Sequence, residues 1–507
     1  MRVTRGAVLL TCAVLLGTAA TGCDAAGGGS GDDGNRGTGP GAPSAPKPPN
    51  ATSTSTGFTL GALAQGPDRP AAGKSQDRPR EGDLNGDGYD DVAFARTGAV
   101  YVVYGSANGP DPRTRTTLAV GGGHPGRDAD NLPRLHRADL DGDGFTDLLV
   151  TVNDGKQYAL WGGARGIAGM RQLAVGGEAL RELGPAGGDF GSVADFDGDG
   201  SGDVFRLGRP AGSSAGSAGV VFHGPFDRRT GKPSRQTELT GPIPTDSAPY
   251  QSTSEDYDGD GRAELTVWFE WTDPDSEGDG DLSVQGVQHF RGTARGLVRA
   301  QESEQGEEFA GHPGDVDGDG DDELYTANFA AFDQKITISV NSTPGRASSG
   351  TPVTLTDLPG LNSRCCGGTE GRAVGDVTGD GRPDLVLSAP ATNSAHGLIF
   401  LIPDLAHVTT ATKPQAVDLE STGVDGENRD PGEGDKAYIR HRLISKPPLL
   451  DVNGDGRLDV VAASGNRRSE DGSTTRRTTG FWVFPGSPEG LDTEASRHIT
   501  EEELDLE

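Results

Sequence analysis

Seven short segments of this chain crowd oxygen-bearing side chains together in a pattern that suits the binding of a hard cation. Each segment has nine residues, with mostly carboxylates at positions 1, 3, 5 and 9 and glycine at positions 4 and 6. Like charges this close repel one another, and a divalent cation turns the repulsion into attraction. The segments are DLNGDGYDD from Asp83, DLDGDGFTD from Asp139, DFDGDGSGD from Asp195, DYDGDGRAE from Asp256, DVDGDGDDE from Asp315, DVTGDGRPD from Asp376 and DVNGDGRLD from Asp451. We call them the first to seventh acidic loops.

Four side chains and one backbone carbonyl in each acidic loop are the candidate metal ligands. Side chains at positions 1, 3 and 5 can converge while the backbone curls around an ion, and the glycines permit the sharp turn. Position 7 varies in residue type, which suits a backbone carbonyl ligand, and position 9 opens the next apolar run. The candidates are Asp83, Asn85, Asp87, Tyr89 and Asp91; Asp139, Asp141, Asp143, Phe145 and Asp147; Asp195, Asp197, Asp199, Ser201 and Asp203; Asp256, Asp258, Asp260, Arg262 and Glu264; Asp315, Asp317, Asp319, Asp321 and Glu323; Asp376, Thr378, Asp380, Arg382 and Asp384; and Asp451, Asn453, Asp455, Arg457 and Asp459.

Calcium is the cation that this ligand set favours. It takes six to eight oxygens, whereas Mg²⁺ prefers fewer protein ligands and keeps its waters. An EF-hand loop would need Glu at position 12 and flanking helices. Position 12 is Phe94, Val150, Arg206, Val267, Thr326, Leu387 or Ala462. The sequence therefore predicts up to seven structural calcium sites that are not EF-hands.

The elements around the acidic loops read as short β-strands. An apolar run follows each loop, a second run such as QYALWG from Gln157 comes next, and a polar third run such as TTLAV from Thr116 follows a Gly-containing turn. With one further segment before the next loop, this makes about four strands per repeat of about 60 residues. The sequence predicts an all-β fold, a seven-bladed β-propeller of four-stranded blades over residues 58–507. The acidic, Gly-rich stretch 421–435 is interpreted as a loop inserted in the last repeat.

The loops resemble the FG-GAP/VCBS-type repeat, found in the seven-bladed propeller of integrin α chains and in many bacterial surface proteins. Phe190-Gly191 and Ser388-Ala389-Pro390 are similar to the segments that give the family its name. The resemblance covers about residues 58–507 and implies calcium at the loop carboxylates. Asn85, Thr378 and Asn453 replace acids, so the first, sixth and seventh sites are expected to bind more weakly. In integrins the ions lie on one face and the ligand on the other, which implies a structural role for calcium here and a partner site elsewhere.

The N-terminus predicts export. Arg2 and Arg5 precede an apolar core and small residues that end at Cys23, so residues 1–22 are expected to be a signal peptide. The ending ATGC resembles a bacterial lipoprotein signal, in which Cys23 carries the lipid. Residues 23–57 are rich in Gly, Ser, Pro and Thr and are expected to form a flexible tether. We expect an outward-facing lipoprotein of a bacterial cell membrane.

Composition limits the partners. The formal net charge of -31 argues against nucleic acid, whose phosphates require clustered Lys and Arg. Hydrophobic residues make up only 32% of the chain, but their short, regular runs favour turn-rich β structure over disorder. Cys365 and Cys366 could form a vicinal disulfide or remain free thiols, and the tryptophans are expected to be buried. These are Trp161, Trp268, Trp271 and Trp482.

No catalytic constellation stands out. The sequence GSSAG at 212–216 fits a nucleophile-elbow pattern but lies in a Gly/Ser loop, and 275–281 lacks the acid that would make it an eighth metal loop. The leading hypothesis is a calcium-stabilised, lipid-anchored binding or adhesion protein that is not an enzyme and uses an unknown extracellular protein or glycan as partner. The alternatives are a propeller-based hydrolase or lyase acting on extracellular polysaccharide or lipid, and a structural component of the envelope.

Overall fold

A computed structural model describes the chain between residues 64 and 505, with gaps. The chain divides into two units, Met1–Ala51 and Thr52–Glu507, and every described residue belongs to the second. The described ranges are 64–65, 73–74, 80–96, 99–119, 134–151, 156–175, 180–181, 191–206, 209–210, 217–240, 247–271, 283–300, 312–330, 335–341, 351–356, 358–359, 371–389, 398–418, 438–439, 442–443, 449–470 and 473–505. Within them no helix has the length and apolar character needed to cross a bilayer.

The described residues build seven antiparallel sheets, which follow one another in chain order. The first four sheets have four strands each. They are β1 (Ala64–Gln65), β4 (Thr116–Ala119), β3 (Ala99–Val103) and β2 (Val92–Arg96); β5 (Arg134–Ala138), β6 (Asp147–Thr151), β7 (Gln157–Trp161) and β8 (Gly169–Gln172); β10 (Val193–Ala194), β11 (Asp203–Arg206), β13 (Ser217–His223) and β14 (Arg235–Thr240); and β15 (Ser247–Glu255), β16 (Glu264–Trp271), β17 (Ser283–Arg291) and β18 (Val298–Arg299).

The last three sheets repeat the pattern, and the final one is built around a long hairpin. They are β19 (His312–Gly314), β20 (Glu323–Ala330), β21 (Lys335–Asn341) and β22 (Val353–Leu355); β23 (Gly371–Gly375), β24 (Asp384–Ala389), β25 (Leu398–Ile402) and β26 (Gln415–Asp418); and β27 (Tyr438–Ile439), β28 (Arg442–Leu443), β29 (Leu449–Leu450), β30 (Asp459–Glu470), β31 (Ser473–Phe484) and β34 (Arg497–Thr500). Smaller elements are the pairs β9 (Leu180–Arg181) with β12 (Arg209–Pro210) and β32 (Gly486–Ser487) with β33 (Gly490–Leu491), and the short helices η1 (Pro112–Thr114) and η2 (Leu405–His407).

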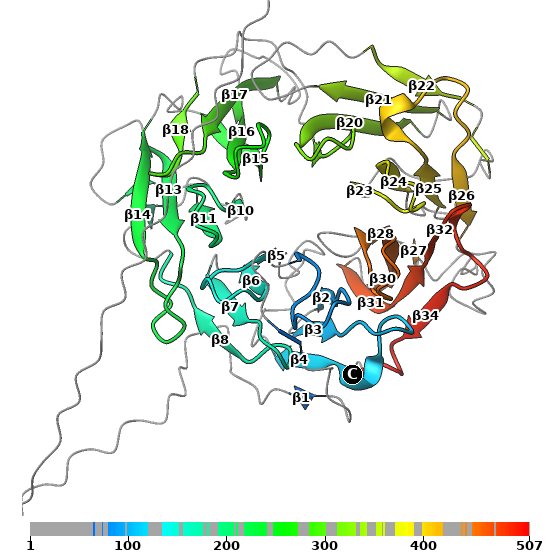
Figure 1. Cartoon of the computed structure of the whole chain (residues 1–507), viewed down its shortest axis with the longest axis horizontal. Helices are drawn as coiled ribbons and strands as arrows, with labels where there is room; N and C mark the ends of the chain where they lie inside the picture. The colour runs from blue at the N-terminus through cyan, green and yellow to red at the C-terminus, as the bar shows by residue number, and fades with distance from the viewer. Residues whose placement is uncertain are drawn as a thin grey trace, which may run out of the picture. The chain divides into compact units, whose positions relative to one another are not determined.

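The seven sheets are the blades of a β-propeller. They succeed one another around a ring, from the blue first blade to the red last blade, which lies beside the first (Figure 1). The predicted all-β, seven-bladed fold with four-stranded blades is therefore confirmed. Position 9 of the acidic loop is the first residue of the following strand in blades two to seven, as predicted, while β2 begins one residue after Asp91.

The core lies between neighbouring blades, which explains why the inner strands are apolar on both faces. In β6, Leu148 and Val150 pack toward the first blade, and Leu149 packs toward the third. Strand side chains alternate between two faces, so a blade sandwiched between two others buries every residue of a continuous apolar run. All five residues of β6 are buried.

Apolar packing also closes the ring. Val92 and Phe94 of β2 share a buried cluster with Val461 of β30 and Phe481 of β31. The rings of Phe94 and Phe481 meet edge to face, with centroids 5.7 Å apart. The last blade thus packs against the first through buried apolar side chains, as consecutive blades pack against each other, and this contact closes the ring.

Several predictions concern residues outside the described ranges. They are the signal peptide 1–22, the lipidated Cys23, the tether 23–57, the segments 212–216, 275–281 and 421–435, and the pair Cys365 and Cys366. Trp161 and Trp482 are buried, each 4% exposed, which confirms the expectation for those two side chains.

Candidate metal centres

Each acidic loop curls around the carboxylate of its first residue. In the second loop, Asp139 Oδ1 accepts from the backbone N–H of Gly142 at 2.8 Å, and its Oδ2 accepts from that of Gly144 at 2.8 Å. The bond from the second glycine recurs in all seven loops, at 2.8–3.2 Å. Position 1 therefore shapes the turn as well as offering oxygens to an ion.

Both loop glycines have positive φ. At position 4 the φ values lie between 64° and 79°, and at position 6 between 80° and 96°. Residues with a Cβ rarely adopt this region, which explains the paired glycines that the sequence repeats seven times.

The carboxylate at position 9 fastens the loop to the strands. One of its oxygens accepts from the backbone N–H of position 2 in all seven loops; for Asp147 the donor is Leu140 at 2.9 Å. In six loops the other oxygen accepts from a backbone N–H one or two residues after the second strand of the hairpin, as Gly162 donates to Asp147 at 2.7 Å. One carboxylate thus holds a loop, a strand start and a turn together.

Four acidic loops bring three carboxylates close enough to share one ion. Within each group the ligand atoms lie within 4.8 Å of one another. The groups are Asp139, Asp141 and Asp147; Asp195, Asp197 and Asp199; Asp256, Asp258 and Asp260; and Asp315, Asp317 and Glu323. Among the described residues no such group forms in the first, sixth or seventh loops, where Asn85, Thr378 and Asn453 occupy position 3.

Two position-3 carboxylates carry an oxygen that fits a bound cation. Asp141 Oδ1 and Asp197 Oδ1 are buried, and neither has a hydrogen-bond partner. A buried ionised oxygen without a donor costs several kcal/mol unless a positive charge compensates it. The residues present therefore fit calcium, whose oxygen ligands these would be.

Burial makes the ninth-position acids hard to ionise. Desolvation raises the pKa of Glu264, Glu323 and Asp459 to about 7, and nearby loop carboxylates add to the shift. The pKa values of Asp91 and Asp147 are raised well above the usual range for the same reasons. A cation in the loop would favour the charged form and reverse these shifts.

Arginines neutralise some of the loop charge. Arg228 contacts Asp141 and Asp143 of the second loop. Arg235 Nη2 lies 2.5 Å from Asp197 Oδ2, and Arg291 Nη2 lies 3.1 Å from Asp258 Oδ2. These arginine side chains are 39–58% exposed, so each guanidinium can move into solvent and would give up its place to a cation bound by the carboxylates.

The acidic loops are also linked to one another, which the sequence does not reveal. In five loops the backbone N–H at position 8 donates to the carbonyl at position 1 of the loop in the preceding blade, as Gly202 donates to Asp139 at 2.6 Å. The further pairs are Ala263 to Asp195, Asp322 to Asp256, Leu458 to Asp376 and Asp90 to Asp451. Pro383 at position 8 of the sixth loop has no N–H to donate.

Position 7 has a second role besides its carbonyl. Its side chain lies against the position-4 glycine of the preceding loop. A Cβ added to Gly454 would lie 2.7 Å from the Tyr89 ring, and a Cβ added to Gly86 would lie 2.9 Å from the Phe145 ring. Ser201, Arg262, Asp321 and Arg457 occupy the corresponding places, and Pro383 does so from position 8. Position 7 varies in type, so no motif marks this contact in the sequence.

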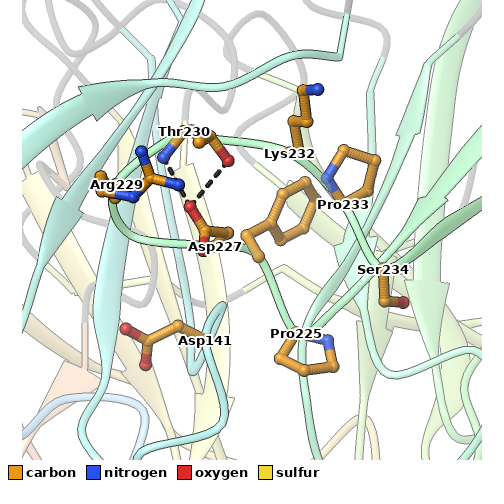
Figure 2. Close-up of a pocket in the computed structure, with 9 residues that line it drawn as sticks. Asp141, Pro225, Asp227, Arg229, Thr230, Lys232, Pro233 and Ser234 are labelled. Atoms are coloured by element: carbon orange, nitrogen blue, oxygen red, sulfur yellow. Dashed lines mark hydrogen bonds between the residues drawn. The ribbon is translucent and has the colours of Figure 1, made fainter.

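A pocket of about 550 Å³ opens beside the second loop (Figure 2). Asp227 stabilises a turn in the pocket wall. Its Oδ1 accepts from the backbone N–H of Thr230 at 2.6 Å and from the Thr230 hydroxyl at 2.7 Å. The lining residues are Asp141, Pro225, Phe226, Asp227, Arg229, Thr230, Lys232, Pro233 and Ser234. Asp141 belongs to both the pocket and the second candidate metal centre.

Comparisons with known proteins agree with the repeat pattern. The family described as FG-GAP-like repeat matches residues 83–150 and 315–387, which include the first, second, fifth and sixth acidic loops. No curated protein matches the chain. A solved structure, the exotype rhamnogalacturonan lyase YesX, is similar at 14% identity over 85% of this chain and 76% of that chain, with a TM-score of 0.15. A TM-score this low supports no transfer of activity.

Proposed function

We propose that this chain, a seven-bladed propeller that carries FG-GAP-like repeats, is a calcium-stabilised binding or adhesion protein, lipid-anchored on the outside of a bacterial cell. The observation that carries the calcium part is the convergence of three carboxylates in each of four loops. The buried Oδ1 atoms of Asp141 and Asp197 support it, because neither accepts a hydrogen bond.

Calcium would serve here as a structural ion. Positions 1, 3, 5 and 9 would supply carboxylate oxygens and position 7 a carbonyl, with as many as seven ions in the chain. An ion held this way would tie each loop to the strand that follows it and, in five loops, to the following blade through the position-1 residue. Because the unfolded chain does not hold these oxygens together, binding would stabilise the folded propeller by mass action.

The N-terminal sequence supports the anchor and the location. A signal-type segment ends at Cys23, and the tether 23–57 would hold the propeller away from the membrane. The net charge of -31 makes an extracellular protein or glycan a better partner than nucleic acid. Sites of this kind in extracellular modules bind calcium at roughly 10⁻⁴–10⁻³ M, a range in which external calcium controls folding.

The first experiment is thermal unfolding of the detergent-solubilised full chain with millimolar calcium and after chelation, with bound calcium counted in the same samples. We expect a large rise in melting temperature and at least four ions per chain, one for each converged group. No bound calcium and no shift would withdraw the metal assignment.

The anchor and the binding role need separate tests. Labelling cells with a fatty-acid analogue should mark the wild-type chain and not Cys23→Ser. Screening the purified protein against cell-wall glycans and secreted proteins should yield a ligand that is released unchanged. Turnover of a polysaccharide or lipid, lost on mutating an acid outside the acidic loops, would replace binding with catalysis.

A further inference from the structure

The third acidic loop differs from the others because a histidine lies among its carboxylates. His223, the last residue of β13, is fully buried. Its Nδ1 lies 3.0 Å from Asp203 Oδ2 and 3.2 Å from Asp197 Oδ2. The three side chains form a group whose ligand atoms all lie within 4.8 Å of one another.

The position that His223 occupies carries no nitrogen ligand in the five other hairpins where the structure describes the equivalent bond. His223 comes directly before Gly224, whose backbone N–H donates to the position-9 carboxylate, Asp203 Oδ1, at 2.9 Å. The equivalent residues are Tyr104, Trp161, Arg291, Pro403 and Pro485. None of these side chains has a nitrogen lone pair available to a metal.

The imidazole ring is held in one orientation. His223 Nε2 lies 3.2 Å from Thr237 Oγ1 on β14, so the hydroxyl fixes the ring nitrogen that faces away from the carboxylates. On another side, a Cβ added to Gly296 would come within 2.7 Å of His223 Cε1, so the ring packs closely against that backbone. Hydrogen bonds to the remote nitrogen are the usual way in which proteins orient a histidine ligand.

Asp197 provides an independent observation that fits a bound cation. Its side chain is 7% exposed, and its Oδ1 is buried without a hydrogen-bond partner. Arg235 contacts only the other oxygen, Oδ2, at 2.5 Å, and the Arg235 side chain is 39% exposed. Its Nη1 also donates to Thr237 Oγ1 at 3.0 Å and to the Arg295 carbonyl at 3.1 Å, both exposed bonds that water can replace. The guanidinium can therefore move toward solvent and leave both Asp197 oxygens to an ion.

We propose that the third acidic loop binds a divalent d-block cation such as Zn²⁺, in preference to calcium, through His223 Nδ1, Asp197 and Asp203. Calcium takes oxygen ligands, whereas imidazole nitrogen suits zinc and its neighbours. Around tetrahedral zinc, with bond lengths of about 2.0–2.2 Å, donor atoms lie about 3.3–3.6 Å apart. The separations of 3.0 and 3.2 Å from His223 Nδ1 are slightly shorter, so a small outward movement of the carboxylates would admit the ion. The inference rests on the proposed function only in that the acidic loops hold cations.

The test is a metal count on the full chain. The detergent-solubilised protein is dialysed against millimolar calcium with zinc buffered at a low micromolar level, and both metals are measured in the same sample. We expect one zinc per wild-type chain, with calcium in other loops. His223→Gln and Asp197→Asn should each reduce bound zinc at least tenfold. The matched control Asp141→Asn, at position 3 of the second loop, should lose calcium and keep the zinc.

X-ray absorption at the zinc edge tests the wild type without any variant. One imidazole nitrogen among oxygen ligands supports the assignment, and a shell of oxygens alone overturns it. Zinc that His223→Gln retains is an adventitious ion only and also overturns it. Calcium in other loops with no zinc in the wild type refutes this inference and leaves the proposed function standing. The absence of both metals refutes both.

Discussion

Asp90 and Asp451 join the two ends of the propeller through a pair of reciprocal hydrogen bonds. The backbone N–H of Asp90 donates to the Asp451 carbonyl at 2.9 Å, and the backbone N–H of Asp451 donates to Asp90 Oδ2 at 2.9 Å. The two residues lie 361 positions apart in the chain. Position 1 of the seventh acidic loop is thereby fixed by position 8 of the first, at the junction where a ring fold must close.

Removing the Asp90 carboxylate should therefore weaken ring closure. Asp90→Ala leaves the buried N–H of Asp451 without its acceptor and removes the partner of Arg80, which lies 3.0 Å away. We expect a loss of about 1–3 kcal/mol in the free energy of unfolding, measured by urea denaturation in calcium. Asp90→Asn, which keeps an acceptor oxygen, is the control and should lose less. Equal losses would mean that the hydrogen bond does not matter.

The two glycines of a loop should differ in their tolerance of a side chain. Gly454 has φ 73° and faces the Tyr89 ring, whereas Gly456 has φ 86° and nothing within 4 Å of its missing Cβ. Asparagine tolerates positive φ better than other residues with a Cβ. We expect Gly456→Asn to cost about 1 kcal/mol or less, and Gly454→Asn to cost about 1–3 kcal/mol more through overpacking. Both are measured by urea unfolding of metal-free protein, and the reverse order would contradict the packing.

An added acid in the sixth loop should have opposite effects with and without calcium. Thr378→Asp gives that loop the acid at position 3 that the second to fifth loops have. With calcium we expect about tenfold tighter binding at this site, since ligand charge tunes affinity. After chelation the extra charge beside Asp376 and Asp380 should lower the melting temperature. Thr378→Asn is the neutral control, and a variant that responds alike in both conditions would argue against a site here.

The stability of metal-free protein should fall as the pH rises from about 4 to 7. Burial raises the pKa of Glu264, Glu323 and Asp459 to about 7 in the folded state, above their values of 4.5, 4.5 and 3.8. The folded state then binds more protons than the unfolded chain between those values, and that contribution is lost as the pH passes the folded pKa. Urea midpoints measured across this range check the slope.

Calcium should reverse this pH dependence, because it competes with protons for the same oxygens. The stabilisation by calcium is expected to grow from pH 5 to pH 7.5. Glu264→Gln should flatten the slope of the metal-free protein and weaken the calcium effect at the fourth loop. A metal-free protein that gains stability with pH over this range would show that these acids are not buried as described.

The sequence alone determined the repeat, the fold class and the candidate ligands. Seven acidic loops at nearly constant spacing, each followed by two apolar runs, predicted the seven four-stranded blades. Local physics suffices for this, because a loop such as Asp139–Asp147 is defined by charge, glycine and strand alternation within a few residues. The strand starts at position 9 were predicted for the same reason.

Only the tertiary structure decided how the loops relate to one another and to the rest of the chain. The hydrogen bond from Gly202 to Asp139 and the packing of Tyr89 on Gly454 join different blades, so no local pattern encodes them. His223 lies 20 residues from Asp203 and reads in the sequence as one more strand residue. Hairpin pairing brings its ring to the third loop, because β13 runs antiparallel to β11 and ends beside Asp203, the last residue of that loop. Contacts fixed by strand register depend on the folded sheet, which is why the sequence suggests candidate metal ligands in the loop but not the histidine nitrogen beside them.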